Sequence, residues 1–178
     1  MSWEPTSLEQ QRLDKLDKLR EAGIEPYPLR AQRTQTTAEA IAAFEKAGDN
    51  SEIDVTEAGL LQSVRDMGTS VFAHITDVHG RIQLFLSREE VGEEMHRVFR
   101  KLTDLGDFVQ ASGKLVRTRT GEISVRVSEW QMLAKTISPL PVVKEQEIDG
   151  QVVRYSAFSD VEERYRQRYA DLAVNPEV

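Results

Sequence analysis

Cysteine is absent from this 178-residue chain, which excludes disulfides, thiolate metal ligands and a cysteine nucleophile. Long apolar runs are also missing, and none approaches the roughly 18 residues that a membrane-spanning helix needs. The first residues, from Met1 to Pro5, contain no basic stretch followed by an apolar one, which argues against a secretory signal. These absences predict a cytoplasmic protein without a membrane partner.

Positive charge is scarce as well, because the formal net charge is −7. A chain with this balance is not expected to coat nucleic acid non-specifically, since its overall field repels phosphate. Residues 54–140, however, carry nearly equal numbers of acidic and basic side chains, whereas the flanking parts are more acidic. Any contact with nucleic acid is therefore expected to be local, specific and in the central part.

Catalytic constellations are absent as well. The histidines His74, His79 and His96 have no metal-ligand spacing with one another, so we interpret them as ordinary surface or half-buried residues. The serines and threonines lack a plausible histidine and aspartate for a triad, and no glycine-rich phosphate loop occurs. The sequence thus predicts neither catalytic residues nor a metal site in this chain.

The N-terminal part is predicted to form two helices. Residues 8–22 have leucines on one helical stripe, with Ser7 as the expected N-cap. The second helix is predicted over residues 38–47, because Thr36 and Glu39 have the spacing of a capping box.

From residue 54 onward the pattern alternates as in strands, with turn-forming residues between the segments. One stretch, residues 91–102, has helical spacing instead. Three strands, a helix and two strands are the order of the OB-fold, a five-stranded Greek-key barrel with a helix between strands 3 and 4. The predicted strands are Val55–Val64, Ser70–Thr76, Arg81–Leu86, Phe108–Val116 and Glu122–Leu133.

Three parts follow from this mainly β interpretation. Residues 1–53 form an N-terminal helical extension and residues 54–140 form the OB-fold barrel. Residues 141–178 are predicted to be a charged linker, followed by a helix that starts after Asp160.

The predicted barrel indicates a class of ligand. OB-folds commonly bind single-stranded nucleic acid or oligosaccharide on the face around strands 2 and 3. Phe72 offers an aromatic face for stacking, Gln83 offers directional donors and acceptors, and Arg65 offers a planar cation. The alternative is that Phe72 is a core residue and Gln83 a solvated strand position, because a fold does not prove a function.

Motifs along nearly the whole chain then point to one family. In order, they are RLDKLDKLREAGIEPYP at 12–28, RTQTTAEAI at 33–41, VRDMG at 64–68, FAHITD at 72–77, GRIQLF at 80–85, LGDFV at 105–109, RTRTGEISV at 117–125 and ERYRQRYADLAVNPEV at 163–178. Their order and spacing resemble the N-terminal, anticodon-binding region of bacterial-type class II lysyl-tRNA synthetases. Aspartyl- and asparaginyl-tRNA synthetases share the barrel, but the first and last motifs favour the lysine enzyme.

The resemblance implies roles for residues of the barrel face. An aromatic residue at the place of Phe72 stacks on the central uridine of the lysine anticodon in that family. Residues at the places of Arg65 and Gln83 contact the same base, and a glutamate at the place of Glu122 contributes to reading a neighbouring base. All four positions match in this chain.

Further expectations concern the surroundings of this face. Arg117 and Arg119 lie in a basic turn that we expect to meet backbone phosphate. Two positions depart from the family pattern: Leu60 stands where a basic residue is common, and residues 142–159 are longer and different from the usual link.

The resemblance also implies a larger parent enzyme. Such a lysine–tRNA ligase attaches lysine to tRNA with ATP and magnesium, as a cytoplasmic homodimer. Its catalytic arginines are not in this chain, so we expect the chain alone to be inactive and to hold no cofactor. Two alternatives remain, a stand-alone OB-fold nucleic-acid-binding module and a protein-interaction module, both without synthetase activity.

Overall fold

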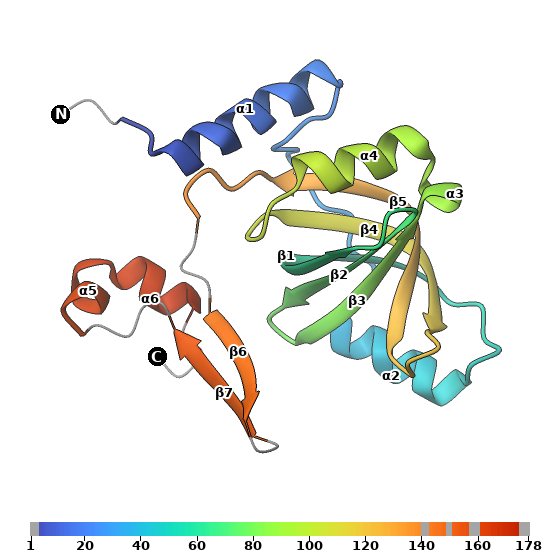
Figure 1. Cartoon of the computed structure of the whole chain (residues 1–178). Helices are drawn as coiled ribbons and strands as arrows, with labels where there is room; N and C mark the ends of the chain where they lie inside the picture. The colour runs from blue at the N-terminus through green and yellow to red at the C-terminus, as the bar shows by residue number, and fades with distance from the viewer. Residues whose placement is uncertain (1–3, 140–142, 149–150, 157–160, 175–178) are drawn as a thin grey trace. The chain divides into compact units, whose positions relative to one another are not determined.

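The computed structural model describes residues 4–139, 143–148, 151–156 and 161–174, and the chain divides into two compact units at residues 137 and 138. The first unit contains the two N-terminal helices, a five-stranded barrel and two short helices inserted into it (Figure 1). Within the described ranges, every helix is too short or too polar to cross a membrane.

The barrel confirms the predicted OB-fold. Its strands are hydrogen-bonded in the order β1-β2-β3-β5-β4, and β4 pairs with β1 to close the barrel. All pairs are antiparallel except β3 with β5. The bounds are β1 Asp54–Asp66, β2 Ser70–Asp77, β3 Gly80–Ser87, β4 Phe108–Arg117 and β5 Ile123–Ala134.

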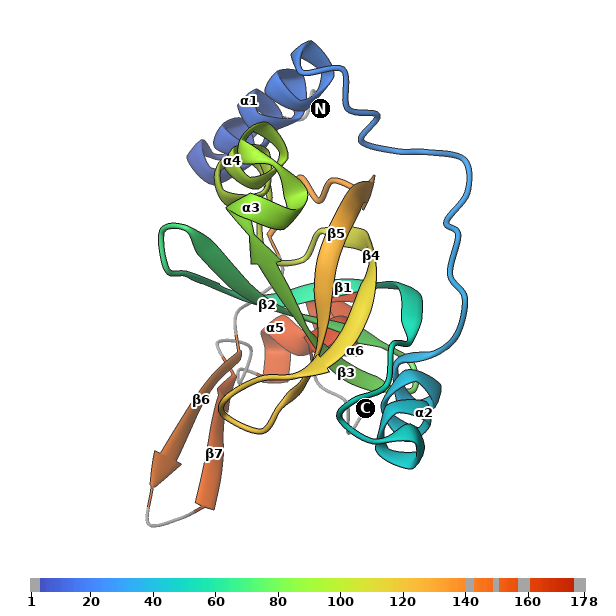
Figure 2. The ribbon, with the colours of Figure 1, turned by 90° about the vertical axis from the view of Figure 1, so that its right-hand side faces the viewer.

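Helices close both ends of the barrel. Figures 1 and 2 show α4 (Glu93–Leu102) over one end and α2 (Thr37–Ala47) at the other. From α4, Phe99 is fully buried and its ring meets the Trp130 ring edge-on, with 5.0 Å between the centroids. From α2, Phe44 is fully buried in the same core. The core therefore continues from the barrel interior into both helices.

The predicted helix at 91–102 is in fact two helices. α3 (Arg88–Val91) ends at Gly92, whose φ of 83° lies in the left-handed region that glycine tolerates best, and α4 begins at the next residue. The helical spacing was correct for α4, but it did not reveal this interruption.

The first helix, α1 (Ser7–Glu21), begins one residue earlier than predicted. Thr6, not Ser7, is the N-cap: its hydroxyl accepts from the Glu9 N–H, and the Glu9 carboxylate accepts from the Thr6 N–H. The prediction chose the wrong one of two adjacent hydroxyl residues, because either can cap a helix. The capping box predicted for α2, Thr36 with Glu39, is confirmed.

Polar contacts hold α1 against the barrel unit. The Arg12 guanidinium donates to the backbone carbonyl oxygens of Thr136 and Leu105. Lys15 pairs with Asp104, whose other carboxylate oxygen accepts from Lys135 at 2.6 Å. A buried charge without a partner would be costly, so these pairs fix where α1 docks.

One buried carboxyl has no such partner. Glu57, on β1 near the α2 end of the barrel, is 0% exposed, and neither of its carboxyl oxygens has a hydrogen-bond partner among the described residues. Burial, aided by the charge of Asp77 and opposed by that of Arg33, raises the pKa of Glu57 to about 7. The carboxyl is therefore mostly neutral in mildly acidic solution.

β4 and β5 approach each other closely at Gly113. A Cβ at this position would lie 2.0 Å from the Arg126 carbonyl oxygen, which leaves no room for any other residue without backbone movement.

The second unit contains a hairpin and two short helices. β6 (Val143–Ile148) pairs antiparallel with β7 (Gln151–Ser156), so the prediction of a linker missed a hairpin here. The helix expected after Asp160 is present but divided into α5 (Val161–Arg166) and α6 (Arg168–Val174).

Candidate nucleic-acid interface

The outer face of the barrel carries a row of cation and aromatic side chains. Arg65 on β1 is paired with Phe72 on β2, Phe72 with Phe85 on β3, and Phe85 with Arg126 on β5. Residues directly opposite one another in a sheet project to the same face. Two aromatic residues therefore lie between two arginines, one at each end of the row.

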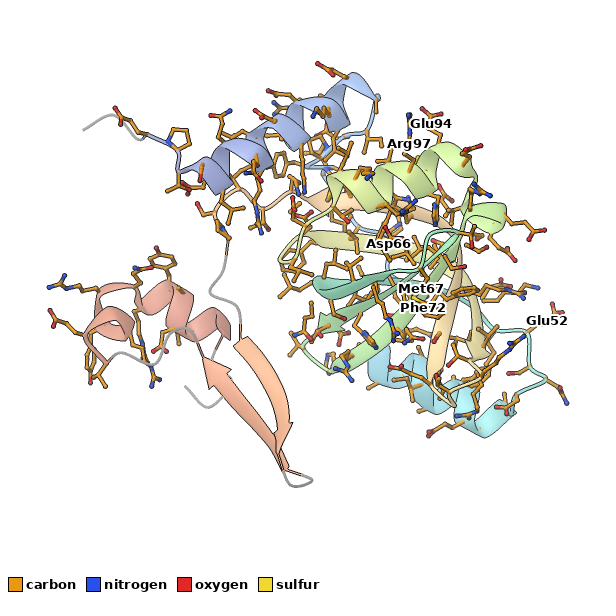
Figure 3. All side chains as sticks on the ribbon, in the orientation of Figure 1. Glu52, Asp66, Met67, Phe72, Glu94 and Arg97 are labelled. Atoms are coloured by element: carbon orange, nitrogen blue, oxygen red, sulfur yellow. The ribbon has the colours of Figure 1, made fainter. Side chains whose placement is uncertain are left out.

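Phe72 lies outside the barrel core. It is partly exposed, whereas its chain neighbours Val71 and Ala73 are fully buried. Its ring stacks on Phe85 with 5.1 Å between centroids and 28° between planes. Figure 3 labels Phe72 together with Asp66 and Met67, near the turn between β1 and β2. The alternative that Phe72 is a core residue does not fit this position.

A second row, of polar residues, crosses the same strands next to the first. Ser63 on β1 is paired with His74 on β2, His74 with Gln83 on β3, and Gln83 with Ser124 on β5. His74 follows Phe72 by two residues and therefore projects to the same face.

Glu122, just before β5, joins this polar row. Its Oε1 accepts from the His74 Nε2 at 2.8 Å and its Oε2 accepts from the Gln83 Nε2 at 2.6 Å. The network continues at both ends: Ser63 Oγ lies 2.8 Å from His74 Nδ1, and Ser124 Oγ donates to Gln83 Oε1 at 2.8 Å. The site thus contains one continuous chain of hydrogen bonds, Ser63–His74–Glu122–Gln83–Ser124.

The two predicted base-contacting polar residues differ in accessibility. Gln83 is 7% exposed, so the alternative of a solvated strand position is wrong. The Glu122 side chain is 39% exposed and lies more openly on the face. A ligand at this face would meet Glu122 readily, whereas the Gln83 amide lies beneath its partners.

His74, Ser63 and Ser124 were not among the predicted site residues. The alternation along β2 is the one signal that could have found His74, because a residue two positions from a surface aromatic shares its face. Ser124 could not have been found in this way, since its place beside Gln83 depends on the parallel pairing of β3 with β5.

The two arginines predicted to meet phosphate occupy the turn between β4 and β5 or its edge. Arg117 already has protein partners: its Nε donates to Asp49 at 2.8 Å, its Nη1 donates to the Gly121 carbonyl oxygen, and its guanidinium lies 5.8 Å from the centre of the Phe44 ring. Arg119 is exposed. Of the two, Arg119 is therefore the better placed for an external phosphate.

The chemistry of this face suits a nucleobase. Aromatic rings stack on bases of any kind, arginine guanidinium groups stack on bases or pair with phosphate, and amide and carboxylate groups recognise base edges. Across the described parts of the chain, no group of three or more His, Asp or Glu side chains is placed to hold a metal ion.

Comparison with known proteins supports this interpretation. Residues 55–133 match the family described as OB-fold nucleic acid binding domain. The chain is 48% identical to a lysine–tRNA ligase of Roseiflexus castenholzii and 45% identical to one of Roseiflexus sp., over 98% of its own length in each case. It is 37% identical to the lysine–tRNA ligase of Bacillus subtilis over 94% of its length.

The chain spans about a third of the length of these relatives, 34% of both Roseiflexus proteins and 32% of the Bacillus protein. The matched domain coincides with the barrel, and the similarity extends across both units. Fold, domain and similarity together show that this chain is related to the anticodon-binding region of the lysyl-tRNA synthetases, with residues 55–133 matching the OB-fold nucleic acid binding domain.

Proposed function

We propose that this chain recognises the anticodon of the lysine tRNA, as part of a lysine–tRNA ligase. The observation that carries the proposal is the pair of rows on the outer barrel face, where Phe72 lies between Arg65 and Phe85 and directly beside the network of Glu122 and Gln83. An aromatic platform next to a set of directional hydrogen-bonding groups is what selection of one unpaired base requires.

Each residue has a distinct part in this proposal. The central uridine of the anticodon stacks on Phe72, and Arg65 and Gln83 contact that base. The Glu122 carboxylate accepts hydrogen bonds from a neighbouring base. Arg119 meets backbone phosphate. Arg117, which forms an ion pair with Asp49, adds positive charge to the same turn.

The remaining steps belong to the parent enzyme in this proposal. The parent binds ATP, magnesium and lysine outside this chain, forms the lysyl adenylate and transfers lysine to tRNA, as a homodimer in the cytoplasm. The chain by itself is then a binding module without ligase activity.

A titration of RNA hairpins tests the proposal. The 178-residue chain should bind a hairpin with the lysine anticodon weakly, and more weakly still when the salt concentration is raised, because a few cations act against a net charge of −7. A matched hairpin whose central uridine is replaced by cytidine should bind less tightly. Equal affinity for both hairpins would contradict anticodon recognition and favour a non-selective OB-fold module.

A further inference from the structure

The Glu122 carboxylate is held from both sides before any ligand arrives. His74 donates to Oε1 and Gln83 donates to Oε2, so neither oxygen can rotate without breaking a bond of 2.8 Å or less. The backbone of Glu122 is held as well, because its carbonyl oxygen accepts from the Thr118 N–H and the Thr118 hydroxyl. The direction of the carboxylate is therefore set by the protein.

His74 is itself held in one orientation. Because an ionised carboxylate can only accept, the His74 Nε2 carries the proton that it shares with Glu122. The other ring nitrogen, Nδ1, lies 2.8 Å from the Ser63 hydroxyl, which fixes the plane of the ring. Ser63 and His74 are on paired strands, so the orientation of the ring is tied to the sheet.

We propose that His74 is a positioning residue for base selection: it aims the Glu122 carboxylate at the base beside the central one, and through Glu122 it also fixes the amide of Gln83. This inference rests on the proposed function. Gln83 shows how the second effect arises, because its NH₂ group donates to Glu122 and its oxygen accepts from Ser124, which leaves its amide no freedom to flip. Loss of His74 releases Oε1, and the carboxylate and amide then lose their common orientation.

Hairpin titrations with the 178-residue chain distinguish positioning from a merely structural role. The set comprises the lysine hairpin, a hairpin changed at the central base, and hairpins changed at each neighbouring base. His74→Ala should reduce the preference at one neighbouring base by at least about tenfold, which corresponds to the lower end of the range for one hydrogen bond to a charged group. His74→Gln, whose amide can still donate to Glu122, should retain most of that preference.

Two controls make the test specific. His79→Ala removes an exposed histidine at the turn between β2 and β3 and should leave every ratio unchanged. In a Glu122→Ala background, His74→Ala should have no further effect on the neighbouring-base preference, because the two residues act as one unit. Should His74→Ala fail to fold, Ser63→Ala replaces it and should weaken the same preference, because it removes the partner of His74 Nδ1.

Several results would overturn the inference. His74→Ala could weaken all hairpins equally, leave all ratios unchanged, or retain its effect without Glu122. A measurement without RNA is also decisive: nitrogen NMR of the free chain should show the His74 proton on Nε2, and a proton on Nδ1 alone would exclude donation to Glu122. If the wild-type chain shows no preference for the central uridine, the proposed function itself is refuted.

Discussion

Replacing Glu57 by glutamine should remove a pH dependence from the stability of the fold. The folded chain holds the pKa of this carboxyl at about 7, against 4.5 when it is unperturbed, because the group is buried near Asp77. Between these two values the folded chain binds a proton that the unfolded chain has released. Stability contributed by the neutral carboxyl is therefore present below pH 4.5 and is lost as the pH rises through 7.

The size of the effect follows from the shift. A difference of 2.5 pKa units corresponds to about 3 kcal/mol of unfolding free energy, at 1.36 kcal/mol for each unit. Wild type and Glu57→Gln should have similar stability near pH 4.5, since both side chains are then neutral. Above pH 8 the variant should be more stable by roughly that amount, because it never has to bury a negative charge.

Urea unfolding at a series of pH values, followed by far-UV circular dichroism, measures this directly. Glu129→Gln is the matched control, because Glu129 is exposed on β5 and makes the same change in charge outside the core. The difference between wild type and Glu57→Gln isolates the one group from other titrating residues. A difference that does not change with pH would refute the reasoning.

Three further predictions concern the site, the chemistry and the packing. Phe72→Ala should weaken binding of the lysine hairpin by roughly 1–3 kcal/mol. Its unfolding free energy should fall by much less than that of Phe99→Ala, which truncates a buried side chain and should lose roughly 3–5 kcal/mol. If the two variants unfold equally readily, Phe72 is not a surface platform. The purified chain should show no lysine-dependent exchange of pyrophosphate with ATP, and robust exchange would place catalytic groups within it. Gly113→Ala should lower the urea midpoint of unfolding, because its methyl carbon meets the Arg126 carbonyl oxygen; a midpoint equal to that of the wild type would contradict the close approach.

Sequence patterns were sufficient where local chemistry determines structure. The five strands were predicted from alternation and turn residues, and each predicted range lies within about two residues of its observed strand. The capping box of α2 was predicted for the same reason, because its two residues are three positions apart.

Two features were not predicted from local patterns: the break between α3 and α4, and the hairpin of the second unit. Gly92 separates α3 from α4, and the spacing of apolar side chains in this stretch does not reveal the break. The hairpin of β6 and β7 was missed although Asp149 and Gly150, a pair typical of two-residue turns, separate its strands in the sequence.

The candidate site was predictable only in part, for a topological reason. Phe72 and Gln83 lie on adjacent strands, so alternation and the family resemblance both indicated them. His74 was interpreted as an ordinary histidine because it has no metal-ligand spacing with His79 or His96. Its actual partners, Ser63 and Glu122, are 11 and 48 residues away in the chain, so no local pattern indicates them. Only the closed barrel brings these three side chains together.

The parallel pairing of β3 with β5 has a consequence for folding. The first three strands form consecutive antiparallel pairs, so Arg65, Phe72 and Phe85 can come together through contacts that are close in sequence. Glu122 and Ser124 join them only when β5 docks on β3, across about 40 residues of intervening chain, and such distant pairings form slowly. A chain caught before that step would carry the aromatic surface without the carboxylate that discriminates between bases, so selectivity, rather than binding, reports that the barrel has closed.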